Sequence, residues 1–329
     1  MTFPRRGLLG AAIAGSALAH PGLARPALAQ RAWPSRPIRL VLGFAPGGVG
    51  DLTARMIAPR ISEGLGQPII IDNRPGAAGI VAAEPVARAA PDGYTMLLLT
   101  TTNSTADAMY RNLPYDTARD FSPVARIATF DHILLTGANS PYRTLKDVIE
   151  AARARPGTIN LGSIAVGNAQ HLGAELLKSM AGVDMTVVPY RSTPDLINAT
   201  TSGDVHIASE ILAPVLGQVQ AGRLRALAMA SAERFPLLPD VPTATERDLP
   251  GYVAGSWNGV AGPAAMPRAI VERMNAEIGR ALALPEVRDK LLELGVTPAF
   301  TSPEDFSAFI RSEGERWSRI VETSNIPKL

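Results

Sequence analysis

Short apolar runs alternate with helical patterns through the first third of the chain. Runs of β-branched residues and leucine at 38–42, 69–71 and 94–99 predict strands. Apolar residues recur at helical spacing over 52–65, where Gly64 and Gly66 mark the end of a helix and Pro59 predicts a kink. A second helical segment covers 80–89. This alternation predicts right-handed βαβ crossovers and a mostly parallel sheet.

The same pattern restarts near residue 133. Further strands are predicted at 133–135, 158–163, 185–188, 205–208 and 224–230. A helix at 145–155 has Thr144 as its expected cap, and another carries Leu172, Leu176 and Met180 on one face. The tail predicts helices at 267–284 and 285–294 and a third opened by Ser302-Pro303-Glu304. Two copies of the strand–loop–helix unit in 329 residues predict two α/β domains.

The N-terminus has the pattern of a cleaved export signal. Arg5 and Arg6 precede an apolar run at 7–19, and Ala27-Leu28-Ala29 is a small-x-small cleavage site. The run is shorter than the roughly 20 residues that span a bilayer. The paired arginines resemble a twin-arginine signal, although Pro4 replaces the usual serine or threonine and Sec export fits nearly as well. Since the chain has no cysteine, disulfides, thiolate metal sites and a lipid-anchored cysteine are excluded. We therefore expect a soluble periplasmic protein, cleaved near Ala29.

Charge gives little reason to expect a nucleic-acid partner. The formal charge of +2 includes three arginines within residues 1–29, and their removal leaves 29 basic against 30 acidic residues, a net charge of −1. Aromatic residues make up only 5% of the chain, and no basic stripe is present.

Two small-residue loops, each between a strand end and a helix start, are the candidate binding elements. A helix N-terminus carries unpaired N–H groups and about half a positive charge, and glycine lets a ligand approach that backbone. Such loops bind phosphate, sulfate or carboxylate at the carboxyl edge of a sheet. The first loop contains Phe44, Ala45, Pro46, Gly47, Gly48, Gly50 and Asp51, and the second contains Ser163, Val166, Gly167 and Asn168.

The same pattern also fits two plain tight turns. The first loop is neither a P-loop, because no Gly-Lys-Ser/Thr follows, nor a dinucleotide fingerprint, because Thr53 occupies the place of the third glycine. Asp51 is expected to cap the following helix by accepting backbone N–H bonds, with direct ligand contact as a secondary role.

The mature chain resembles the Bug/TctC family, the substrate-binding proteins of tripartite tricarboxylate transporters. Nine short blocks in order carry the resemblance, and a similar helical tail follows them. They are Trp33-Pro34-Ser35-Arg36-Pro37-Ile38, Ala45-Pro46-Gly47-Gly48 with Asp51, Asn73-Arg74-Pro75-Gly76-Ala77-Ala78-Gly79, Ala90-Pro91-Asp92-Gly93-Tyr94, Leu113-Pro114-Tyr115-Asp116 with Asp120-Phe121, Met180-Ala181-Gly182-Val183-Asp184, Val188-Pro189-Tyr190-Arg191, Ala221-Gly222-Arg223-Leu224-Arg225-Ala226-Leu227 and Pro239-Asp240-Val241-Pro242-Thr243.

The resemblance implies an α/β type II periplasmic-binding-protein fold, in which two doubly wound domains joined by a hinge enclose a ligand cleft. The implied divisions are a signal peptide at 1–29, a discontinuous first domain at 30–131 plus 255–329, and a second domain at 132–254. The resemblance places the first jaw at 44–51 and the second at 163–171, with 190–193 and Glu210 lining the wall. His171, Arg191, Ser192 and Glu210 thereby join the candidate ligand-binding residues.

Several positions depart from the family pattern. Ile164 and Ala165 replace the more usual glycine or serine, Ser192 replaces a glycine, and Glu210 introduces an acid. An acid at this wall could select an amine-bearing ligand such as an amino acid. Arg191 either meets a second carboxylate as a bidentate donor or forms a surface ion pair.

These features predict a solute-binding protein, not an enzyme. The expected ligand is a small carboxylate, whether a di- or tricarboxylate, an amino acid or an aromatic acid. The expected partners are membrane transporter subunits, or a sensor protein for an orphan receptor, and the protein is expected to be a monomer without cofactor or metal. One alternative is an exported hydrolase using Ser163 and His171. The other is a transcription-factor effector domain, which the signal sequence and the missing helix-turn-helix oppose.

Overall fold

The computed structural model describes residues 33–76, 79–164, 166–323 and 326–328. The predicted signal peptide lies outside these residues. Among the described helices, none combines the length and apolar character required to cross a bilayer.

The first sheet combines strands from both ends of the chain. Its order is β2-β1-β3-β9-β4, with β10 on the outer side of β4. β1 is parallel to β2 and β3, whereas β9 is antiparallel to both β3 and β4. The strands are β1 (Ile38–Leu42), β2 (Ile69–Asn73), β3 (Thr95–Thr100), β9 (Gly255–Pro263), β10 (Thr297–Pro298) and the first part of β4 (Phe121–Gly137).

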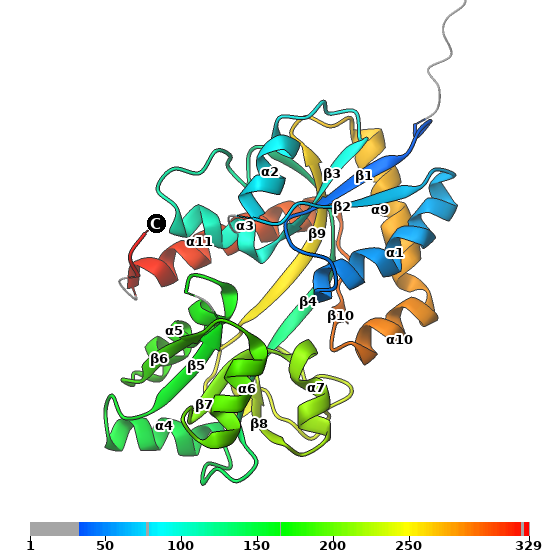
Figure 1. Cartoon of the computed structure of the whole chain (residues 1–329). Helices are drawn as coiled ribbons and strands as arrows, with labels where there is room; N and C mark the ends of the chain where they lie inside the picture. The colour runs from blue at the N-terminus through cyan, green and yellow to red at the C-terminus, as the bar shows by residue number, and fades with distance from the viewer. Residues whose placement is uncertain (1–32, 77–78, 165, 324–325, 329) are drawn as a thin grey trace, which may run out of the picture. The chain divides into compact units, whose positions relative to one another are not determined.

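Helices cover both faces of this sheet and form the first lobe with it (Figure 1). One apolar core joins the sheet to α1 (Val49–Leu65), α9 (Arg268–Ala283) and α10 (Pro285–Glu293). A second core on the opposite face includes α2 (Ile80–Ala87) and α11 (Pro303–Thr323). The helix α3 (Thr101–Met109) packs against α11.

The second lobe is built around the second sheet, in the order β4-β7-β5-β6, with β8 also paired to β4. Its strands are β5 (Asn160–Ile164), β6 (Thr186–Tyr190), β7 (Ile207–Ile211), β8 (Leu224–Met229) and the rest of β4. One core contains α4 (Leu145–Ala154) and α5 (Ala169–Ala181), and the other contains α6 (Thr193–Ser202) and α7 (Leu212–Gln220). The short helix α8 (Ala244–Arg247) follows β8.

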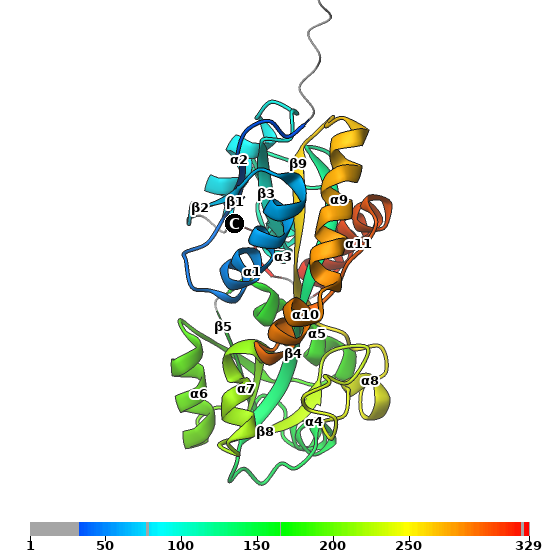
Figure 2. The same cartoon turned by 90° about the vertical axis from the view of Figure 1, so that its right-hand side faces the viewer.

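The long strand β4 belongs to both sheets (Figure 2). Asp131 is the last residue that pairs with β9, opposite Gly255, and His132 is the first that pairs with β7, opposite Ile211. The strand therefore changes partners between two consecutive residues. The domain limits expected from sequence remain a prediction.

The sequence patterns located most elements but misjudged the sheet. The Thr144 cap is confirmed, with a capping box to Asp147, and α1 ends at Gly66 in the left-handed conformation. The expectation of mostly parallel sheets is wrong, because the long β4 and the unpredicted β9 run antiparallel to their neighbours. The structure is a mixed α/β fold.

Candidate functional site

The first loop joins β1 to α1 and leaves the helix N-terminus without a side-chain cap. Gly48 is the N-cap, in an extended conformation (φ −71°, ψ 161°), and no side chain accepts a hydrogen bond there as a cap. Residues 45–48 are exposed. The first helical hydrogen bond runs from the Leu52 N–H to the Gly48 carbonyl, at 3.0 Å. The N–H groups before Leu52 therefore lack intrahelical acceptors and carry the positive end of the helix dipole.

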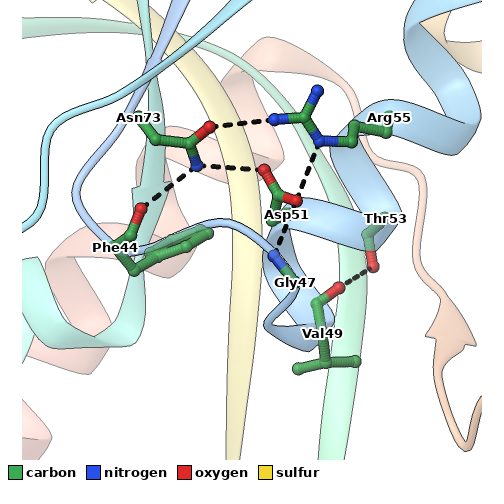
Figure 3. A network of polar contacts seen from close by, with 7 residues as sticks. All are labelled: Phe44, Gly47, Val49, Asp51, Thr53, Arg55 and Asn73. Atoms are coloured by element: carbon green, nitrogen blue, oxygen red, sulfur yellow. Dashed lines mark hydrogen bonds and ion pairs between the residues drawn. The ribbon is translucent and has the colours of Figure 1, made fainter.

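Asp51 holds this loop in shape from the inside (Figure 3). The residue is only 1% exposed. One carboxylate oxygen accepts the Gly47 N–H at 2.9 Å and the Arg55 Nε–H at 2.8 Å, and the other accepts the Asn73 Nδ2–H at 2.9 Å. The same Asn73 amide donates to the Phe44 carbonyl at 3.1 Å. The loop thus presents backbone to solvent while its one acid faces inward.

The structure corrects the expected capping role of Asp51. The helix begins at Val49 with Gly48 as its N-cap, and the one backbone N–H bonded to the Asp51 carboxylate is that of Gly47, before the helix. Burial disfavours the Asp51 charge, but hydrogen bonds from Arg55, Gly47 and Asn73 outweigh that penalty and lower the pKa to about 2. Asp51 therefore remains ionised and structural at neutral pH.

A pocket of about 290 Å³ lies beside this loop, against the N-terminus of α3. Its lining includes Phe44, Gly79, Thr100, Thr102 and Asn103. Thr100 and Asn103 form a capping box that fixes the start of α3. Sequence reasoning missed these residues, although a threonine followed three positions later by asparagine resembles a helix-start signal.

Asn258 forms a buried polar floor behind the first loop. It lies on β9 opposite Thr100, is 3% exposed, and its Nδ2 has no hydrogen-bond partner among the described residues. A Cβ added at Gly50 would lie 2.9 Å from that nitrogen and 2.7 Å from Cζ of Phe44. A larger residue at position 50 would require the Phe44 ring or the Asn258 amide to shift, and that amide is an unused donor among the described residues.

The second loop leads from β5 into α5. Asn168 is the N-cap, and its Oδ1 accepts the His171 N–H at 2.9 Å. Gly167 has a φ of +83°, and a Cβ added there would lie 3.1 Å from Cε of Met109 in α3. Val166 is 61% exposed. The strand-to-helix loop expected from sequence is confirmed, with one of its helix-end N–H groups already capped.

Ser163 and His171 lie near this loop without a hydrogen bond between them. Ser163 is fully buried, and His171 is also buried. Neither Oγ of Ser163 nor Nδ1 of His171 has a hydrogen-bond partner among the described residues. Burial lowers the pKa of His171, so the imidazole is neutral at pH 7. The serine–base hydrogen bond that the hydrolase alternative requires is not formed between these residues.

The Glu210 side chain links the starts of three helices in the second lobe through hydrogen bonds. Its carboxylate accepts hydrogen bonds from Gln170 of α5 at 3.0 Å, from Thr193 of α6 at 2.9 Å and from the Ile211 N–H at 2.7 Å. The residue is 1% exposed, and burial raises its pKa, although these three donors partly offset the rise. Both carboxylate oxygens accept hydrogen bonds from the protein, so Glu210 fixes the positions of the segments around it.

Arg191 and Ser192 follow β6 directly. Ser192 caps α6 by accepting the Asp195 N–H at 3.3 Å, and its hydroxyl donates to the Asp195 carboxylate at 2.7 Å. Arg191 is exposed and forms no ion pair with a described residue. An exposed guanidinium without a carboxylate partner is available to an anion.

Strand direction explains which candidates the structure brings together. β5, β6 and β7 are parallel, so the segments that follow them meet at one edge of the second sheet. Phe44 to Asp51 form a separate group at the carboxyl edge of β1. The helix α3 lies near both groups, because its start lines the pocket beside the first loop and a Cβ added at Gly167 would lie 3.1 Å from Cε of Met109 at its end.

Comparison with known proteins places the chain among receptors. Residues 53–326 match the family model described as the tripartite tricarboxylate transporter family receptor, TctC. A curated relative, the UPF0065 protein in the tcbD–tcbE intergenic region of a Pseudomonas species, is 38% identical over 291 residues, which are 88% of this chain and 87% of the relative.

Two solved structures share the fold and carry ligands in their descriptions. An R. palustris protein solved with adipate is 36% identical, with a TM-score of 0.78 over 90% of this chain and 100% of that one. MatC from Rhodopseudomonas palustris with bound malate is 32% identical, with a TM-score of 0.73 over 88% and 100% of the two chains. The predicted family and the type II periplasmic-binding-protein fold are thereby confirmed.

Proposed function

The chain belongs to the TctC family of solute-binding receptors, and we propose that it captures a small dicarboxylate between its two lobes in the periplasm. The observation that carries this proposal is the first loop, where exposed backbone at residues 45–48 leads into an uncapped helix N-terminus and the only acid, Asp51, is turned inward. Such a surface attracts an anion, and it presents no side-chain carboxylate to a cation.

The second lobe supplies a different kind of anion site. The Asn168 side chain accepts one backbone N–H of α5, and the Ser192 side chain accepts one of α6. The Glu210 carboxylate accepts the Ile211 N–H just before α7. Arg191 adds an exposed positive charge without an ion-pair partner among the described residues. One carboxylate at α1 and a second at Arg191 would connect the lobes, and this favours a ligand with two acidic groups.

Two related receptors whose descriptions include a bound dicarboxylate, adipate or malate, support this ligand class. Micromolar affinity corresponds to about −8 kcal/mol. A few charge-assisted hydrogen bonds, each worth about 1.5–3 kcal/mol, supply that after the cost of ordering the lobes. Ligand-driven closure would then present a defined surface to transporter subunits, or to a sensor protein, with the receptor acting as a monomer without catalysing a reaction.

A thermal-shift screen of the purified mature protein tests the proposal. Adipate, malate and succinate are compared with monocarboxylates, tricarboxylates, amino acids and the uncharged diester dimethyl adipate. We expect dicarboxylates to raise the melting temperature and to be recovered unchanged by mass spectrometry. Equal stabilisation by the diester would contradict anion recognition, and conversion of the ligand would indicate an enzyme.

A further inference from the structure

A second and larger pocket, of about 550 Å³, lies where β4 passes from one sheet to the other. Its walls come from both lobes: β4, β9, β10 and α11 on one side and residues 230–236 on the other. We call it the hinge pocket. None of its lining residues belongs to the two loops described above. Its volume lies within the range of roughly 300–1,000 Å³ that is usual for small-molecule sites.

Arg126 is the unpaired cation of the hinge pocket. Its guanidinium carbon lies 4.5 Å from the ring centroid of Phe309, and its buried Nε has no hydrogen-bond partner among the described residues. No described carboxylate lies within ion-pair distance of it. A buried guanidinium edge without an acceptor matches a carboxylate entering the pocket.

Other charged groups that line the pocket have partners within the protein. Glu313 accepts the Nε1–H groups of Trp257 at 3.2 Å and Trp317 at 3.0 Å and pairs with Arg316 at 3.1 Å. Asp131 accepts the Thr297 hydroxyl at 3.2 Å, and burial raises the pKa of its carboxyl.

Glu233 is exposed at the rim, and Arg234 pairs with Glu246 outside the pocket at 2.9 Å. The remaining wall is largely apolar and includes Phe235, Trp257 and Phe309.

We propose that the hinge pocket is a second ligand site, for a small organic monocarboxylate with a compact apolar body. The carboxylate would pair with Arg126, and the body would pack between the aromatic side chains. Because the walls belong to both lobes, any rotation of the lobes about β4 changes the shape of the pocket. We therefore expect occupancy of the hinge pocket to alter dicarboxylate affinity, and by linkage the dicarboxylate to alter the affinity of the hinge pocket by the same factor.

Calorimetric titration with benzoate tests this site, with the uncharged benzamide as the matched control. We expect both the wild-type protein and Gly48→Val to bind benzoate. Arg126→Gln should bind benzoate at least about 10-fold more weakly than wild type, because it loses one charge-assisted pair. Arg311→Gln, an exposed arginine of α11, should bind as wild type. Melting curves establish that each variant is folded, and Ala299→Trp, which fills the pocket, should also abolish binding.

The variants separate failure of this site from failure of the proposed function. Benzoate binding that is lost in Gly48→Val and kept in Arg126→Gln would place the ligand at the first loop and overturn the hinge pocket. Equal binding of benzamide would overturn recognition by Arg126. Benzoate at saturation should change the Kd of the best dicarboxylate by about 3-fold or more, and an unchanged value would refute the coupling to the hinge.

Discussion

Replacing Gly48 with valine changes the surface of the first loop without disturbing its packing. A Cβ at this position meets only the Ala45 carbonyl oxygen, at 4.0 Å, and the backbone is extended, which any residue adopts. Gly48 makes no side-chain cap that could be lost, so the stability cost should stay below about 1 kcal/mol. The valine methyl groups would instead occupy the space in front of the α1 N-terminus.

The expected loss of affinity follows from the hydrogen bonds that the methyl groups would displace. Losing one charge-assisted bond costs about 1.5–3 kcal/mol, which corresponds to roughly a 10- to 150-fold increase in Kd for a dicarboxylate. Isothermal titration measures the change, and urea unfolding measures stability. Gly217→Val is the matched control, because this glycine of α7 also has open space around it. Unchanged affinity in a folded Gly48→Val protein would refute anion binding at this helix end.

Arg191→Ala should lower the affinity for dicarboxylates about 5- to 30-fold, which is less than the loss expected for Gly48→Val. The affinity for a monoester of the same acid should fall less, and titration of both ligands checks this order. Glu210→Gln should leave the ratio of aspartate to succinate affinities unchanged within about 3-fold, since both carboxylate oxygens already bind protein donors; a 10-fold shift in that ratio would show that Glu210 selects amines. Asp51→Asn should lower the free energy of unfolding at pH 7. Because the folded pKa of about 2 lies below the ordinary 3.8, this contribution is present above pH 4 and disappears as the pH falls towards 2, so urea melts of the two proteins should converge there.

The helix ends that were predicted correctly depend on capping and turn residues close to them in the sequence. The capping residue Thr144, the glycine stop at Gly66 and the Pro285 start of α10 each have a direct physical cause that is visible in the sequence. The two strand-to-helix loops followed from the same local patterns. These features depend on a few neighbouring residues, so no knowledge of the sheet was needed.

The elements that escaped prediction depend on tertiary context. β9 is glycine-rich and lacks alternation. The part of β4 before the predicted strand at 133–135 contains two bulges, near Pro123 and near Arg126, that break its period of two. The helix α3 is rich in threonine, asparagine and serine, which favour turns, and it is held by packing against α11. The inward direction of Asp51 could not be read from spacing, because it depends on Asn73 of β2.

A crystal structure of the mature protein with the tightest dicarboxylate tests the central claim most directly. The predicted result places one carboxylate within hydrogen-bond distance of the N–H groups at the start of α1, and the other beside Arg191 in the second lobe. A ligand bound away from the first loop, or touching only one lobe, would contradict it.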